Sequence, residues 1–437
     1  MKILVVGGGI AGLTAAYELQ KGGHAVQVLE RESVAGGRMR SERAGDFVVD
    51  RGAQFISSAY RNMRALAGEL GIAGEIHAIA RSDNAMVRRG QLWLGAYDSI
   101  GRLFRSGYLS VGARLRLPLL LPVLWRHWKT LDPMRPETAA PLDDEDAPTF
   151  LRRIVGEEAF EYVFQPAFSG TFDSEPESLS KAFVLTTLRF FFSGFRLLAF
   201  RGGNGLLTTA LASRVPVTTG AVVHAVVSDG NGVRVTATID RHEREERADA
   251  AVIAVPGSLV GALCPTLTEE ERRFFEQVRY CRGIIVFFLM RGLPSFECYG
   301  IGLPRRECAD IYGLAVDHYK QGVAPPGHGL VNCAFSEAAA ARWYDADDEA
   351  VVRFALDTLA RTPVGSLEPL VGARVHRWDP MLPQFHRGYV RAIDAFLRRR
   401  ERSPRLAFCG DYLVGPYTEA ALTSGLRAAE ELQRAGA

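Results

Sequence analysis

The chain has 437 residues, of which 47% are hydrophobic and 23% charged, a globular composition that excludes a largely disordered or fibrous protein. Its 52 basic and 50 acidic residues give a formal charge of +2, so no global field favours nucleic acid. At about 150 residues per domain, this length predicts two or three domains. The cysteines form no C-x-x-C pair, and we expect reduced thiols in a cytoplasmic protein with no metal site.

The first elements in chain order are a strand, a helix and a second strand. Residues 3–6, 11–21 and 25–29 show these patterns and predict a right-handed βαβ unit. A helix is expected at 61–70, and residues 99–200 lack strand alternation, which predicts helices interrupted by prolines. Later strands are predicted at 215–218, 222–227, 233–239, 250–255, 283–290 and 406–409, with a hairpin turn at 229–232 and a final helix at 418–434.

The loop after the first strand carries Gly7, Gly9 and Gly12 in the spacing G-x-G-x-x-G. Gly7 permits a tight turn, Gly9 lets backbone approach a pyrophosphate, and Gly12 lets the helix pack closely on the strand. The helix N-terminus attracts phosphate, and Glu30, which ends the second strand, suits ribose hydroxyls and disfavours the 2′-phosphate of NADP. The motif predicts a dinucleotide site that includes the adjacent residues Ile10, Ala11 and Arg31.

Three further motifs are Gly36-Gly37-Arg38, Asp50-x-Gly52-Ala53-Gln54 and, near the C-terminus, Cys409-Gly410-Asp411 with residues 415–425. They resemble motifs of the amine oxidase, protoporphyrinogen oxidase and phytoene desaturase superfamily of FAD enzymes. The resemblance implies FAD, bound without a covalent link. The other cofactor-binding residues that it implies are Phe55, Val222, Val223, Val255, Trp378, Thr418 and Ala421.

The resemblance also implies an α/β fold, with a Rossmann-like FAD-binding domain and an inserted α+β substrate domain that includes a helical subdomain. Together with the order of the elements, it predicts a discontinuous FAD-binding domain at residues 1–60, 201–260 and 375–437. The substrate-binding domain is then expected at residues 61–200 and 261–374. Its helical part, residues 99–200, is a candidate membrane-facing surface.

The middle of the chain is most similar to the protoporphyrinogen oxidase group, at residues 149–180 and 377–385. This similarity implies that a large hydrophobic substrate is dehydrogenated or desaturated by hydride transfer to flavin N5. Amine oxidases carry a lysine on the strand that corresponds to residues 283–290, whereas this chain has none between Lys181 and Lys320, so a typical amine oxidase is not expected. No catalytic group is identified, and the candidates near the flavin are Trp378, His386 and Tyr417.

Other functions stay open at this point. They are a phytoene desaturase-like enzyme, a flavin-dependent isomerase or biosynthetic tailoring enzyme, and a non-catalytic lipid or prenyl carrier on the same fold. The expected partners are a hydrophobic small molecule and oxygen or another electron acceptor. Residues 117–125 are apolar with basic flanks, which fits either a buried helix or a segment on the inner face of the cell membrane.

Overall fold

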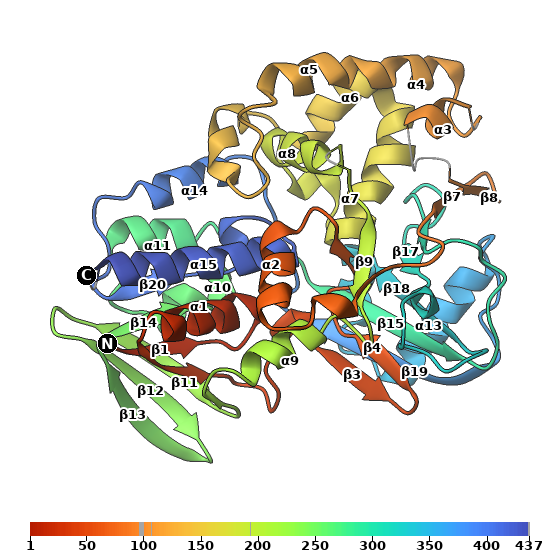
Figure 1. Ribbon diagram of the computed structural model, residues 1–437. Helices are drawn as coiled ribbons and strands as arrows, with labels where there is room; N and C mark the ends of the chain where they lie inside the picture. Colours follow the sequence, from red (N-terminus) through yellow and green to blue (C-terminus); the bar gives the residue numbers. More distant parts are fainter. Residues whose placement is uncertain (96–99, 106, 193, 436–437) are drawn as a thin grey trace.

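The computed structural model describes residues 1–95, 100–105, 107–192 and 194–435, and it contains two main sheets with a group of helices above them (Figure 1). The first sheet has five parallel strands, contributed by three separate parts of the chain. In spatial order they are β10 (Val217–Thr218), β2 (Ala25–Leu29), β1 (Lys2–Val6), β14 (Ala250–Ile253) and β20 (Leu406–Phe408). The predicted α/β class with a Rossmann-like parallel sheet is confirmed.

Beside this sheet, a helix from the N-terminal part of the chain packs on a helix from the C-terminal part. Helix α1 (Ile10–Lys21) follows β1, and α15 (Thr418–Ala435) packs directly on it. A Cβ atom at Gly425 would lie 2.3 Å from the carbonyl oxygen of Ala11, so the two backbones touch without intervening side chains. Helix α2 (Arg61–Glu69) contacts α15, and α9 (Leu206–Ala212) contacts α1.

A second, three-stranded sheet contains β11 (Val222–Ser228), β12 (Val233–Ile239) and β13 (His242–Ala248). The predicted hairpin joins β11 and β12, with Asp229 and Gly232 hydrogen-bonded across its turn. The third strand was not expected, because its sequence HEREERA is almost entirely exposed and polar and shows no apolar alternation.

The largest sheet has seven strands and lies on the other side of the molecule (Figure 1). Strand β15 matches the predicted range and is buried along its whole length. The predicted domain boundary between residues 374 and 375 falls inside β19. In spatial order the strands are β19 (Leu370–Trp378), β15 (Gly283–Met290), β18 (Gly329–Phe335), β17 (Ile311–Ala315), β16 (Gly300–Gly302), β7 (Asn84–Arg88) and β8 (Gln91–Leu94).

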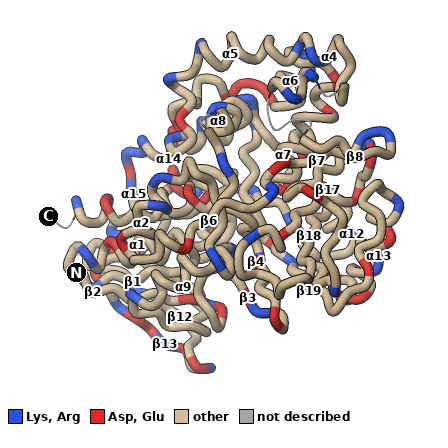
Figure 2. Tube along the Cα trace, turned by 45° about the vertical axis from the view of Figure 1, so that its right-hand side comes forward, with Lys and Arg blue, Asp and Glu red and all other residues tan. Residues whose placement is uncertain are grey.

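The predicted helical stretch forms the layer at the top of Figure 1, and Figure 2 shows basic residues on α4 and at the end of α5. Residues 99, 106 and 193 lie outside the described part. The stretch ends in an unexpected strand, β9 (Leu197–Phe200), which pairs with β5 (Ile56–Ser57) and β6 (Ile76–Ala78). Its helices are α3 (Ile100–Arg105), α4 (Val111–Arg116), α5 (Leu120–His127), α6 (Ala147–Ala159), α7 (Gln165–Phe172) and α8 (Lys181–Phe191), with a π-helical turn, η5, at Phe160–Phe164.

Shorter elements connect these layers. Strands β3 (Ser41–Ala44) and β4 (Phe47–Asp50) form a hairpin of their own. In the part of the chain that the structure describes, no helix is long and apolar enough to cross a membrane. The remaining helices are α10 (Gly257–Leu263), α11 (Glu269–Phe275), α12 (Glu337–Trp343), α13 (Asp348–Ala360) and α14 (Tyr389–Leu397).

Candidate active site

A single cavity of about 1630 Å³ is lined by residues of the parallel sheet, the seven-stranded sheet and the helical layer. Gly12 is the one predicted cofactor residue that does not line it. A Cβ atom there would lie 2.0 Å from the carbonyl oxygen of Gly7, so Gly12 packs α1 against the preceding turn. The others all line the cavity: Gly7, Gly9, Ile10, Ala11, Glu30, Arg31, Gly36, Gly37, Arg38, Gly52, Ala53, Gln54, Phe55, Val222, Val223, Val255, Trp378, Gly410, Asp411, Thr418 and Ala421.

Glycines form one end of the cavity. Gly7 has a φ of 107°, which favours glycine, and a side chain there would also strike the carbonyl of Ala254. Gly9 precedes α1, and no atom lies within 4 Å of the position that its Cβ would occupy. The neighbouring Gly36 bridges to Gly9 through a short parallel pairing. This open, side-chain-free backbone at a helix N-terminus fits a pyrophosphate.

Glu30 is almost fully buried at the end of β2, and both of its carboxylate oxygens accept backbone hydrogen bonds. Oε2 accepts from the N–H of Gly8 at 2.6 Å, and Oε1 accepts from the N–H of Glu32 at 2.8 Å. Each carboxylate oxygen can accept a second bond, so Glu30 keeps acceptor capacity for ribose hydroxyls. It therefore shapes the glycine turn as well as facing the cavity.

Arg38 and Asp411 link the two ends of the chain across the cavity wall. Nη1 of Arg38 lies 2.7 Å from Oδ2 of Asp411, and the same guanidinium donates to the carbonyl of Met381. The hydroxyl of Tyr280 donates to Oδ1 of Asp411 at 3.2 Å. Because Asp411 is 4% exposed, this pairing is a buried, charge-assisted contact that fixes both groups beside the site.

A buried lysine supports the loop that carries Gln54, a feature that the sequence did not reveal. Nζ of Lys320 lies 3.0 Å from Asp50 and 2.7 Å from Asp317, and it approaches Oε1 of Gln54 at 3.5 Å. Asn332 donates to the same Gln54 oxygen at 3.1 Å. Burial alone would lower the pKa of Lys320, but the two carboxylates raise it, so the ammonium stays charged.

The other half of the cavity is apolar. Eight of its lining residues are phenylalanines from α7, α8 and the segments next to them, and Ile285 of β15 also lines it. Within residues 183–200, the phenylalanines at 183, 190, 191, 192 and 195 line the cavity, whereas Phe200 is buried in the core cluster that includes α1. The eight phenylalanines are Phe164, Phe168, Phe172, Phe183, Phe190, Phe191, Phe192 and Phe195.

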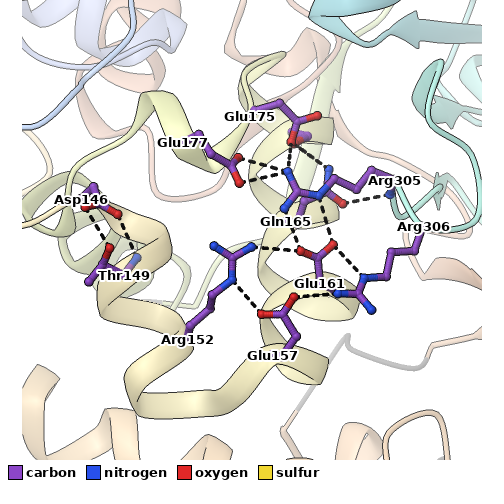
Figure 3. A network of polar contacts seen from close by, with 11 residues as sticks. Asp146, Thr149, Arg152, Glu157, Glu161, Gln165, Glu175, Glu177, Arg305 and Arg306 are labelled. Carbon is purple, nitrogen blue, oxygen red and sulfur yellow. Dashed lines mark hydrogen bonds and ion pairs between the residues drawn. The ribbon is translucent and has the colours of Figure 1, made fainter.

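An ionic network fastens the helices of this apolar half to the seven-stranded sheet (Figure 3). Arg305, between β16 and β17, contacts Glu161 at 2.7 Å, Glu177 at 3.1 Å and Glu175 at 3.3 Å. Glu161 is 3% exposed, and although burial would raise its pKa, Arg305 holds it below the ordinary value. The pairing holds the turn η5 and α7 over the sheet.

The three candidates for a catalytic side chain differ in their position relative to the cavity. Trp378 lines the cavity, and its indole N–H donates to the carbonyl of Arg51 at 2.9 Å. Tyr417 also lines it, but its hydroxyl donates to the carbonyl of Pro133 at 2.6 Å and burial raises its pKa, so it is a poor proton donor. His386 is not among the described residues that line the cavity. It contacts the carbonyls of Arg387 and Gln277 instead.

A carboxyl group on the apolar wall is a second feature that the sequence analysis missed. Asp173 follows α7 directly, in the left-handed conformation with a φ of 49°, and lines the cavity. Burial, with a further contribution from the charge of Glu337, raises the pKa of Asp173 to about 7. No group of three or more His, Cys, Asp or Glu side chains in the described ranges could hold a metal ion.

Comparisons with known proteins agree with this geometry. The model of the flavin-containing amine oxidoreductase family matches residues 10–433. The mitochondrial protoporphyrinogen oxidase of Nicotiana tabacum is 30% identical over 180 residues, which are 41% of this chain and 34% of that protein. The match thus spans about a third of the tobacco protein. A coproporphyrinogen III oxidase of Mycobacterium tuberculosis is 22% identical over 444 residues, covering 94% of this chain and 92% of that protein.

Solved structures show the same fold at low identity. A proposed protoporphyrinogen oxidase from Exiguobacterium sp. 255-15 has a TM-score of 0.79 at 18% identity, over 99% of both chains. A triple mutant of putrescine oxidase has a TM-score of 0.82 at 17% identity, also over 99% of both chains. With the family match over nearly the whole chain, the protein belongs to the flavin-containing amine oxidoreductase family.

Proposed function

We propose that the protein dehydrogenates a large, apolar, cyclic substrate of the porphyrinogen type. The observation that carries this proposal is the continuity of the cavity, which joins the glycine-lined end to a chamber walled by phenylalanines. A volume of about 1630 Å³ exceeds the range of roughly 300–1,000 Å³ that is usual for a single small-ligand pocket, so it has room for a dinucleotide and a bulky second ligand.

The residues of the glycine-lined end would hold FAD without a covalent link. Gly9 and the N-terminus of α1 would receive the pyrophosphate, Glu30 the ribose, and the Arg38–Asp411 pair would lie along the rest of the cofactor. Bound FAD supplies a two-electron acceptor, and the protein supplies binding, orientation and exclusion of water. The apolar walls would exclude water from the reacting carbon of the substrate.

The strand β15 argues against a small amine as the substrate. Its sequence GIIVFFLM contains no lysine, and the residue that lines the cavity is Ile285. Relatives named protoporphyrinogen oxidase and coproporphyrinogen III oxidase support a tetrapyrrole precursor. The match to a family of oxidoreductases argues against a non-catalytic lipid or prenyl carrier.

Anaerobic mixing tests the proposal. The purified, yellow protein is mixed without oxygen with a porphyrinogen, a polyene and benzylamine, and the visible flavin band is followed. We expect the porphyrinogen alone to bleach the flavin rapidly. Rapid bleaching by benzylamine, with none by the porphyrinogen, would overturn the proposed substrate class.

We further propose that the α4–α5 segment rests on an anionic membrane surface. Leu115, Leu119, Leu121 and Trp125 are exposed, with Trp125 83% exposed, and basic residues flank them (Figure 2). Residues 117, 118, 120 and 121 of this segment also line the cavity, so an apolar substrate could pass from a bilayer to the site.

The test uses the exposed residues of the segment. Leu120 and Leu124 are buried, so their substitution would disturb the core rather than the surface. The double variant Leu121→Glu and Trp125→Glu should abolish cosedimentation with vesicles of phosphatidylglycerol and leave the flavin spectrum unchanged. Wild-type protein that stays in the supernatant at low salt would overturn this membrane proposal.

A further inference from the structure

Asp173 lines the cavity directly after α7, on the wall that carries the phenylalanines of that helix. Its carboxyl group is close enough to Cys281 to act on the thiol electrostatically, and burial together with this charge raises the pKa of Cys281 to about 12. The backbone of Cys281 is hydrogen-bonded to Met381 and Leu382, which both line the cavity. The carbonyl of Met381 in turn accepts from Arg38. This series of contacts leads from the wall that carries Asp173 towards Arg38 at the cofactor end.

The carboxyl group of Asp173 has no hydrogen-bond donor among the residues that the structure describes. The ionisable groups that face it are Glu337 at the start of α12, Tyr312 on β17 and Cys281 before β15. None of these is a cation. The neighbouring Glu175 differs, because Arg305 and Gln165 both contact its carboxylate.

A carboxyl group without a partner in an apolar wall is costly to keep. Its charged form is disfavoured by burial, and the nearby charge of Glu337 adds repulsion. No contact in the described structure offsets this cost, whereas Glu175, two positions away, is paired with Arg305. Asp173 is half-buried and faces the cavity, a position typical of a functional carboxylate, and a ligand in the cavity can supply the donor that the described residues do not.

We propose that Asp173 recognises the substrate by accepting hydrogen bonds from the N–H groups of a nitrogen-containing ring. The proposal rests on the proposed function, since a porphyrinogen carries pyrrole N–H groups that can turn together towards one face. A carboxylate facing them would complete its own hydrogen bonds and orient the ring in the chamber. An alkylammonium ion offers the same N–H chemistry, and the experiment separates these two sources.

The experiment measures binding without turnover. The probe is meso-octamethylporphyrinogen, whose bridging carbons carry no hydrogen and so cannot be dehydrogenated; its N-methylated derivative lacks the donors. The test variant is Asp173→Asn, because asparagine tolerates the left-handed conformation. The matched control is Asp83→Asn, since Asp83 lines the same cavity but already pairs with Arg102 at 3.1 Å.

We expect Asp173→Asn to weaken binding of the probe at pH 8 by about tenfold or more, as hydrogen bonds to charged acceptors do. The Asp83→Asn variant should bind the probe as tightly as the wild type, and binding of the N-methylated probe should be the same with and without the Asp173→Asn substitution. Affinity of the wild type should rise as pH increases through about 7, where Asp173 ionises, and this rise should vanish in Asp173→Asn. In Glu337→Gln the rise should move to lower pH, because a repelling charge is removed.

The outcomes separate this proposal from the proposed function. Tight binding of the probe that is equal in wild type and Asp173→Asn would overturn the role of Asp173 and leave the substrate class standing. If the yellow wild-type protein does not bind the probe at all, both the ring ligand and the proposed substrate class fail. Binding of dodecylammonium instead, lost in Asp173→Asn, would assign the carboxylate to a cationic amine and overturn the ring proposal.

Discussion

The two halves of the cavity are built in different ways. The glycine-lined half depends on backbone conformation within a few short motifs near both ends of the chain, such as the open position at Gly9. The apolar half depends on side chains from distant segments, held by charge pairs such as that of Arg305 with Glu161. The affinity for the cofactor should therefore change when a substitution adds or removes a few atoms in the glycine-lined half. The shape of the substrate chamber should change when a substitution breaks a contact that positions a whole helix.

The largest expected effect comes from breaking the support of the apolar half. Arg305→Met removes the nearest of three arginine partners of the buried Glu161. It leaves Arg152 and Arg306, so we expect the free energy of unfolding to fall by about 3 kcal/mol. In the wild type, Arg305 depresses the pKa of Glu161 despite burial, so this stabilisation is present at neutral pH and is lost as pH falls below the ordinary pKa of a glutamate.

Urea unfolding measures this difference. Arg353→Met serves as the control, because Glu349 is the one carboxylate that pairs with Arg353 among the described residues, on an exposed helix face, and the pair should contribute less than about 1 kcal/mol. Equal stability of Arg305→Met and wild type would show that the network does not hold the chamber together.

A smaller effect is expected in the glycine-lined half. Glu30→Gln keeps the shape of the side chain but removes its charge, so FAD affinity should fall by roughly 1.5–3 kcal/mol, the range for hydrogen bonds to a charged group. The exposed neighbour Glu32→Gln should change affinity little. Titration of the apoprotein with FAD measures both, and an unchanged dissociation constant for Glu30→Gln would contradict the assignment of the ribose to Glu30.

The smallest effect concerns Asp173 and pH. Its folded pKa of about 7 lies above the ordinary value, so the group costs stability increasingly as pH rises from about 4 to 7. Asp173→Asn removes this cost, and after allowance for water in the cavity its gain in stability should be about 1–2 kcal/mol greater at pH 8 than at pH 5. Urea unfolding at both pH values checks this, and a pH-independent difference would show that Asp173 ionises normally.

The parallel sheet and the glycine turn could be predicted from the sequence because both are local. The spacing of Gly7, Gly9 and Gly12 and the βαβ pattern all fall within the first 30 residues. The hydrogen bonds that Glu30 accepts from the backbone N–H groups of Gly8 and Glu32 could not be predicted, because these groups point at the carboxylate only once the turn has folded.

The substrate half was harder to predict because its contacts are distant in sequence. Lys320 meets Asp50 across 270 positions, and no local pattern signals such a pair. Asp173 lies in the polar run DSEPE, which is typical of a solvated turn, and only tertiary packing places it on a cavity wall. Strand β16 has three residues, too few for a period-2 pattern to be recognised.

The central claim is that one continuous cavity holds FAD at the glycine-lined end and a large cyclic substrate at the apolar end. Ala167→Trp tests it most directly, because Ala167 lines the cavity on α7, next to Phe168 and Pro166. The measurement is the rate at which a porphyrinogen bleaches the flavin anaerobically, alongside the dissociation constant of FAD. We predict an unchanged dissociation constant and the loss of bleaching. Unchanged bleaching with the tryptophan in place would contradict the claim.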